Sequence, residues 1–297
     1  MAYKILNNIS VKDSASSDLA SLKTSMLVIT IDKNTKKDKS FRALDKAAKG
    51  FLSSTVASHL NDEGSSISLP SIDGINAENI LLVKSWDAKT PIHKWLGSIK
   101  SITKQANKLK AKDISFVINS SYPINKDVFW MIESVSKTIE SNAYIFTETK
   151  NKTVKKPTLK KLVLFVSDMN PSDLRKAKSS AKKGFAIGEG VNTAKYLGDL
   201  PANHATPKII EKKVKAMTKD FPNLKVKSFN EKDLAKMGMG SYLSVAKGSD
   251  EPPRMMVIEY KGAKASEKPI ALVGKGITFD TGGVSLKPPQ GMDEMKW

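Results

Sequence analysis

The stretch Met-Leu-Val-Ile-Thr-Ile at residues 26–31 is a short run of apolar and β-branched side chains. Runs of this length and composition, bounded by polar segments, are typical of strands buried on both faces of a sheet. The same pattern recurs along the chain at residues 80–83, 114–118, 162–166, 255–258 and 270–273. The sequence therefore predicts a series of short buried strands.

Helical patterns separate these runs. They cover residues 92–109, 128–139, 173–197 and 207–221. In the last of them, Thr206 is a good N-cap, Pro207 suits the first helical position, and apolar residues recur along one face. Strands that alternate with helices indicate an α/β fold built around a largely parallel sheet.

The length of 297 residues favours two domains over one. The best boundary is a polar, lysine-rich stretch around residues 148–161, which contains Pro157 and shows no hydrophobic periodicity. We expect an N-terminal α/β domain over residues 1–150, a linker over 151–161 and a second α/β domain over 162–297.

Composition limits where the protein works. The absence of cysteine excludes disulfides and thiolate metal sites in this sequence. The N-terminus lacks the pattern of a secretory signal, and no apolar run approaches the ~18 residues that would span a bilayer. We expect a cytoplasmic protein with no membrane partner.

The formal charge of +19 raises nucleic acid as a partner. Most of the basic residues are lysines scattered along the whole chain, and the arginines that specific phosphate readers favour are few. Scattered lysines are more often a solvated surface. DNA binding without catalysis therefore stays open as an alternative function.

The stretch ALVGKGITFDTGGVSLK at residues 271–287 carries the most specific chemistry. An apolar strand that ends in a glycine-rich turn places polar side chains at the carboxyl edge of a sheet, where α/β proteins usually bind ligands. The phosphate-loop pattern is absent, and a dinucleotide fingerprint fails because Phe279 occupies the position of its third glycine. Nucleotide binding is therefore disfavoured.

Residues 274–287, with Met292 and Asp293 after them, closely resemble the leucyl (cytosol) aminopeptidases, a two-metal peptidase family. Residues 192–207 are similar to the helix and proline-containing turn that open the family's catalytic domain. Residues 237–260 resemble the segment that leads to its metal site. The N-terminal part of the chain is similar to the family more loosely.

The resemblance implies roles for four residues. Lys275 and Asp280 would be metal ligands, with Asp280 bridging two divalent ions, Mn²⁺ or Zn²⁺. Lys287 would stay protonated and bind the scissile carbonyl oxygen, and Met295 would line the pocket for the substrate side chain. The family's alignment makes Asp293 a residue that does not bind metal, and we expect His59, His93 and His204 to be structural.

The resemblance also implies fold, activity and assembly. It implies an N-terminal domain of the macro-domain type, release of N-terminal leucine or other apolar residues from peptides, and a homo-hexamer in the full-length protein. The family's next aspartate ligand would follow Trp297 directly, and a later D-x-E-x-R segment would supply further carboxylates. We therefore expect this chain to be a fragment with an incomplete metal site and negligible activity alone. The alternative is a non-catalytic family member that binds DNA or serves only in assembly.

Overall fold

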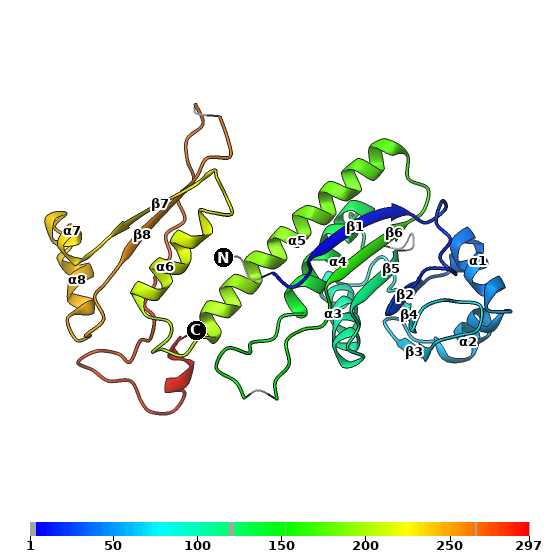
Figure 1. The fold of residues 1–297 in the computed structure, drawn as a ribbon, viewed down its shortest axis with the longest axis horizontal. Coiled ribbons are helices and arrows are strands. Elements are labelled where there is room, and N and C mark those ends of the chain that lie inside the picture. The colour runs from blue at the N-terminus through cyan, green and yellow to red at the C-terminus, as the bar shows by residue number, and fades with distance from the viewer. Residues whose placement is uncertain (1–3, 119–121, 152, 265, 297) are drawn as a thin grey trace. The chain divides into compact units, whose positions relative to one another are not determined.

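The computed structural model describes residues 4–118, 122–151, 153–264 and 266–296. It divides into two compact units, one from Lys4 to Asn192 and one from Thr193 onward. The long helix α5 (Pro171–Asp199) contributes residues to both units (Figure 1). Each unit is described below by itself.

The first unit is built on a six-stranded sheet. Its strands are β1 (Asn8–Asp13), β2 (Met26–Ile31), β3 (Ser66–Pro70), β4 (Asn79–Lys84), β5 (Asp113–Ile118) and β6 (Lys161–Val166). They lie in the order β1-β6-β5-β2-β4-β3, and every pair is parallel except β3 with β4 (Figure 1). The α/β fold with a mainly parallel sheet, predicted from the sequence, is confirmed.

Helices cover both faces of this sheet. Alternate residues of β2 show why: Leu27, Ile29 and Ile31 pack with the apolar side chains of α1 (Lys39–Ala47) and α2 (Phe51–His59). On the other face, Phe116 of β5 lies beside residues of α3 (Ile92–Lys108) and α4 (Val128–Asn142). Strands covered on both sides carry the continuous apolar runs from which they were predicted.

Helix α5 packs against α4 with almost no space between the two backbones. A Cβ added at Gly184 would lie 2.1 Å from the carbonyl oxygen of Glu133, and one added at Gly188 would lie 2.7 Å from Cβ of Glu140. Neither distance is compatible with a larger side chain in the present arrangement. The two glycines therefore let α5 approach α4 closely.

At the contact between α4 and α5, Glu140 is fully buried and accepts hydrogen bonds from the backbone of Ile5 and Leu6. Its carboxylate accepts the N–H groups of Ile5 at 2.7 Å and Leu6 at 2.9 Å, and the side-chain amide of Asn192 donates to it at 3.2 Å. Burial raises the pKa of Glu140, with a further contribution from the charge of Glu189, while these hydrogen bonds oppose the shift. The carboxylate thus joins the N-terminal segment, α4 and α5.

The second unit has a much thinner core. Its elements are α6 (Pro207–Met217), β7 (Leu224–Phe229), α7 (Glu231–Lys236), α8 (Gly240–Ala246), β8 (Met255–Tyr260) and a 3-10 turn at Met292–Lys296. The antiparallel pair β7–β8 is its sheet, and four consecutive residues of β8 are exposed. A two-stranded ribbon is only marginally stable without further packing.

The expected strand at residues 270–273 does not form, and this prediction was wrong. Ile270, Leu272 and Val273 are 91%, 95% and 98% exposed, and the segment has no secondary structure. A strand needs a neighbour for its backbone groups, and no described strand pairs with this segment. The apolar pattern is present, but the packing that it requires is absent.

The polar stretch proposed as a linker, residues 151–161, lies inside the first unit. Lys160 donates its N–H to the carbonyl of Lys112, and β6 follows at once as a central strand of the sheet. Along the chain, the division between the two compact units falls after Asn192, within α5. Among the described helices, none combines the length and apolar character needed to cross a membrane.

We predict that Gly184→Ala destabilises the first unit by about 1–3 kcal/mol, because the new methyl group must push α5 away from α4. Gly190→Ala is the matched control on the same helix, since nothing lies within 4 Å of its added Cβ. The free energy of unfolding of the control should rise by up to about 1 kcal/mol, because alanine has a higher helix propensity than glycine. Urea unfolding followed by circular dichroism measures both, and equal effects would contradict the packing described here.

The raised pKa of Glu140 predicts a pH dependence of stability. The folded state binds this proton more tightly than the unfolded state, so the contribution to the free energy of unfolding falls as pH rises above the ordinary value of 4.5. Glu140→Gln should reduce that fall, whereas the exposed control Glu63→Gln should leave it unchanged. Unfolding free energies measured from pH 4 to pH 8 would show an unaltered slope in Glu140→Gln if the assignment is wrong.

Candidate functional site

A glycine turn folds residues 280–287 back on themselves. Gly282 and Gly283 have φ values of +103° and +83°, which L side chains rarely adopt. A Cβ at Gly282 would also lie 2.4 Å from the carbonyl oxygen of Ser285. The turn is closed by the N–H of Lys287, which donates to the carbonyl of Thr281 at 2.9 Å. Glycine is thus required for Lys287 to return beside Asp280.

Two lysines converge on the carboxylate of Asp280. The Nζ atoms of Lys275 and Lys287 lie 3.5 Å and 3.3 Å from the same oxygen, Oδ2. The other oxygen accepts the N–H of Gly282 at 3.0 Å. The Gly282 hydrogen bond first, and then the two lysines, hold the pKa of Asp280 below its ordinary value. The carboxylate is therefore ionised at neutral pH.

The fourth residue singled out from the sequence, Met295, lies in the same cluster. The Lys287 ammonium donates to the sulfur of Met295 at 3.1 Å. The carbonyl oxygen of Met295 accepts the N–H of Asp280 at 3.3 Å. The side chains of Asp280 and Lys287 are about one-third exposed, at 30% and 35%, and that of Lys275 is 73% exposed. The structure thus places all four residues together on an open surface.

The charges at this cluster do not balance. Two ammonium groups face one carboxylate, and no group of three or more His, Cys, Asp or Glu side chains in the described part of the chain could hold a metal ion. A lysine binds metal only as the neutral amine, which is reached when burial and neighbouring cations lower the pKa of its ammonium group. Among the described residues, Lys275 and Asp280 therefore do not make a complete metal site.

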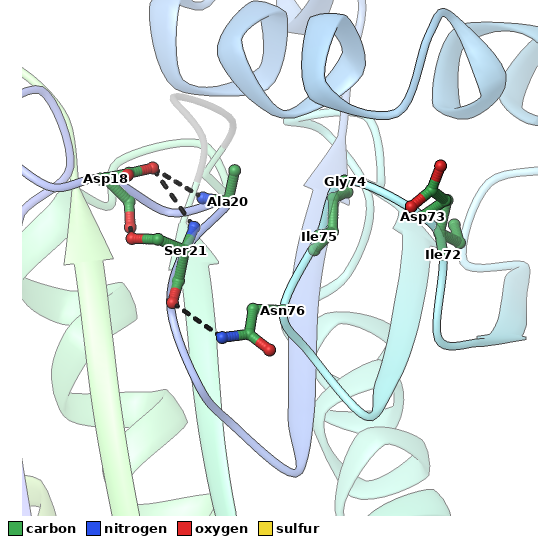
Figure 2. A pocket seen from close by; sticks show the side chains of 8 residues that line it. All are labelled: Asp18, Ala20, Ser21, Ile72, Asp73, Gly74, Ile75 and Asn76. Carbon is green, nitrogen blue, oxygen red and sulfur yellow. Dashed lines mark hydrogen bonds between the residues drawn. The ribbon is translucent and has the colours of Figure 1, made fainter.

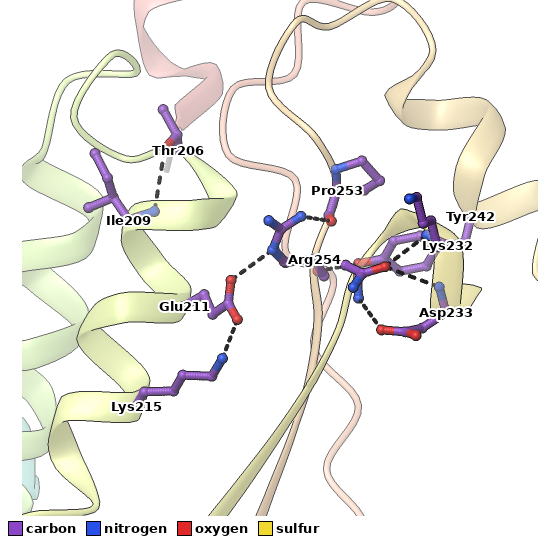
Figure 3. A network of polar contacts seen from close by, with 10 residues as sticks. Thr206, Ile209, Glu211, Lys215, Lys232, Asp233, Tyr242, Pro253 and Arg254 are labelled. Atoms are coloured by element: carbon purple, nitrogen blue, oxygen red, sulfur yellow. Dashed lines mark hydrogen bonds and ion pairs between the residues drawn. The ribbon is translucent and has the colours of Figure 1, made fainter. Parts of the chain in front are cut away.

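A second polar network, which the sequence analysis did not identify, ties α6 to the start of β8 (Figure 3). The guanidinium of Arg254 donates to Glu211 at 2.7 Å and to the carbonyl of Pro253 at 2.8 Å. Lys215 also pairs with Glu211, and the Tyr242 hydroxyl donates to the carbonyl of Arg254 at 2.7 Å. The only available sequence signal was the rarity of arginine in a lysine-rich chain.

The first unit has two hollows that could bind a ligand. One, of about 530 Å³, is open and lies between residues 18–21 and 72–76 (Figure 2). The Asp18 carboxylate there accepts the N–H groups of Ala20 and Ser21. These loops precede β2 and β4, at the amino ends of the strands, whereas α/β proteins bind ligands at the carboxyl ends.

The other hollow does lie at the carboxyl ends of β2, β4 and β5, beside Trp95. Its volume of about 30 Å³ holds roughly two water molecules, which is too little for a peptide. The indole N–H of Trp95 has no hydrogen-bond partner among the described residues. Neither hollow offers the reactive groups that the Asp280 cluster combines.

Two solved structures share this fold. A mutant of tomato leucine aminopeptidase matches 86% of this chain and 51% of its own, with 20% sequence identity and a TM-score of 0.67. The bottromycin maturation enzyme BotP, in complex with Mn, matches 92% of this chain and 52% of its own, with 19% identity and a TM-score of 0.64. At these identities the likeness defines the fold.

Sequence comparisons indicate a family. Residues 192–297 match the description "Cytosol aminopeptidase family, catalytic domain". A probable cytosol aminopeptidase of Azotobacter vinelandii is 35% identical over 279 residues, and the cytosol aminopeptidase of Pseudomonas aeruginosa is 34% identical over 279 residues. Nearly the whole chain is thus similar to cytosol aminopeptidases, and residues 192–297 match the catalytic domain of that family. The chain covers 56% of the length of each of these two relatives, while 93% of the chain itself is matched.

The Arg254 network predicts acid sensitivity of the second unit. Lys215 and Arg254 lower the pKa of Glu211 to about 2, so its stabilising contribution is present above 4.5 and is lost as pH falls toward 2. Glu211→Gln should cost about 2 kcal/mol at pH 7 and remove this dependence. Asp220→Asn, at an exposed carboxylate of the same unit, should change little. Urea unfolding at pH 7 and pH 3 tests this, and equal pH dependence in wild type and Glu211→Gln would refute it.

Proposed function

We propose that this chain supplies the N-terminal domain and the first part of the catalytic site of a metal-dependent aminopeptidase. The substrate class is peptides with a free N-terminus, preferably with leucine or another apolar first residue. One observation carries the proposal: Lys275 and Lys287 both reach the carboxylate of Asp280 within a motif of the cytosol aminopeptidase family. The match of nearly the whole chain to cytosol aminopeptidases supports the same reading.

Lys275 and Asp280 fit the role of metal ligands in part. Their side chains already converge, and the donor types, an amine nitrogen and a carboxylate, suit Zn²⁺ or Mn²⁺. The described residues form no group of three or more His, Cys, Asp or Glu side chains that could hold a metal ion, so further ligands would be needed. Two bound ions would supply Lewis acidity and a hydroxide at neutral pH.

Lys287 has a role that does not depend on binding a metal. Its ammonium group, which lies beside Asp280 at the end of the turn at Gly282, would donate to the carbonyl oxygen of the bond that is cleaved. Negative charge grows on that oxygen in the tetrahedral intermediate, and a fixed cation stabilises it. Met295, in contact with Lys287, would form part of the wall for the first side chain of the substrate.

The proposal also covers the cellular location, the oligomeric state and the binding partners. The relatives carry the word cytosol in their names, which supports a cytoplasmic location for this chain. The family resemblance supports a homo-hexamer for a full-length protein. For DNA binding, the charge of +19 is the sole argument, and the lysines that produce it are spread along the sequence. We therefore favour the peptidase.

The test uses two proteins, because the chain spans about half the length of its relatives. The 297-residue chain alone should hydrolyse leucine p-nitroanilide negligibly with Mn²⁺ or Zn²⁺. A fusion of the chain to the part of the Azotobacter vinelandii relative that follows the segment equivalent to residues 273–297 should hydrolyse it. Chelation should abolish that activity and Mn²⁺ should restore it.

In the fusion, Lys287→Met should lower kcat by about 10²–10³-fold, because the developing oxyanion loses its cation. Lys268→Met, at an exposed lysine outside the cluster, is the matched control and should retain wild-type activity. Robust turnover by the chain alone would refute the expected dependence on outside ligands. An active Lys287→Met fusion would refute the role given to Lys287.

A further inference from the structure

The smaller hollow of the first unit lies where the path of the chain changes from one face of the sheet to the other. After β2 the chain passes through α1 and α2, which pack with Leu27, Ile29 and Ile31. After β4 and β5 it passes through α3 and α4, beside Phe116 on the opposite face. Because β2 lies between β4 and β5, its carboxyl end is a topological switch point, the position at which open α/β sheets bind ligands.

The surface of this hollow is almost entirely apolar. Val83 and Phe116 line it from the sheet, Ile99 lines it from α3, and Met131 lines it from α4. A volume of about 30 Å³ has room for roughly two water molecules, or for a group of about two or three non-hydrogen atoms. The hollow therefore fits one end of a small molecule.

One buried polar group in this wall lacks a partner. Trp95 is 5% exposed, and its indole N–H has no hydrogen-bond partner among the described residues. By contrast, the indole of Trp86 donates to the hydroxyl of Ser98 at 2.8 Å, and the Thr30 hydroxyl donates to the carbonyl of Val117 at 3.0 Å. An indole N–H can only donate, and a buried donor without an acceptor is unfavourable. The occupant that suits the hollow therefore brings an acceptor atom.

Charge separates the ligands that could supply this acceptor. Trp86 also lines the hollow and is partly exposed, and the Lys94 ammonium lies 5.3 Å from the centroid of its ring. A cationic ligand would therefore meet a second positive charge and would bring no acceptor to Trp95. A carboxylate would bury its charge against a single neutral donor, which is unfavourable in an apolar site. A neutral carbonyl oxygen accepts the N–H without either cost.

We propose that this hollow binds a small neutral carbonyl compound, an amide or a ketone. Its oxygen accepts the indole N–H of Trp95, and its alkyl group packs against Phe116 and Ile99. The remaining part of the ligand extends toward Trp86. All of these residues belong to the first unit, so the site would bind its ligand without the Asp280 cluster.

The experiment uses the 297-residue chain labelled with nitrogen-15, in which each of the four tryptophans gives one indole N–H signal. The variants Trp95→Phe and Trp130→Phe identify two of these signals. Acetamide is the probe, because it is small, neutral and planar. It should shift the Trp95 signal in a saturable way at millimolar concentrations, as expected for so small a ligand, and leave the Trp130 signal unchanged. The absence of a saturable Trp95 shift overturns the proposal and leaves water as the occupant of the hollow.

Acetate and acetamidinium are the matched controls for charge, since both have nearly the same shape as acetamide. Each should bind more than about tenfold more weakly than acetamide, because each would bring a charge into an apolar hollow. Equal binding of acetate and acetamide would contradict the neutral class of ligand.

Two variants test the residues that form the site. Trp95→Phe removes the donor and should weaken acetamide binding about tenfold, measured from the methyl signal of Met131 at the hollow. Val83→Ile should also weaken binding while keeping the fold, since the added methylene group occupies space that the hollow provides. Trp130 is partly exposed and does not line the hollow, so Trp130→Phe should bind like the wild type. Wild-type affinity in both Trp95→Phe and Val83→Ile would refute the site.

Discussion

An apolar strand must be covered on both faces and paired along its edges, and the two units of this protein differ in how far they meet that constraint. In the first unit, β2 lies between β4 and β5, with α1 and α2 on one face and α3 and α4 on the other. Its backbone groups are paired and its side chains are buried. In the second unit, β8 has one neighbour and residues 270–273 have none among the described strands. The same sequence pattern therefore has opposite outcomes in the two places.

This difference explains how much the sequence could predict. The strands at residues 26–31, 114–118 and 162–166 were found because burial on both faces leaves a continuous apolar run. Strand β1, with the pattern Asn-Ile-Ser-Val-Lys-Asp, was missed because an edge strand has polar residues interleaved with apolar ones. The run at residues 270–273 was predicted as a strand and does not form one, since a local pattern contains no information on whether a partner is present.

The candidate site shows the same limits. The resemblance of residues 274–287 to a known family singled out Lys275, Lys287 and Met295, which the structure brings together through the turn at Gly282. The network of Arg254 and Glu211 could not be predicted, because it joins residues 43 positions apart whose separate patterns are those of ordinary surface charges. Contacts of this kind depend on the path of the chain between them.

The hydrogen bonds from Ile5 and Leu6 to the Glu140 carboxylate affect the order in which the first unit can fold during translation. The first strand, β1, pairs with β6, and the segment before it is fixed by Glu140 and, through it, by Asn192. These partners leave the ribosome long after the N-terminus does, separated from it by 134 residues or more. The segment around Ile5 and Leu6 therefore stays unpaired until β6 and α5 have been synthesised, and β1 is the last strand to join the sheet.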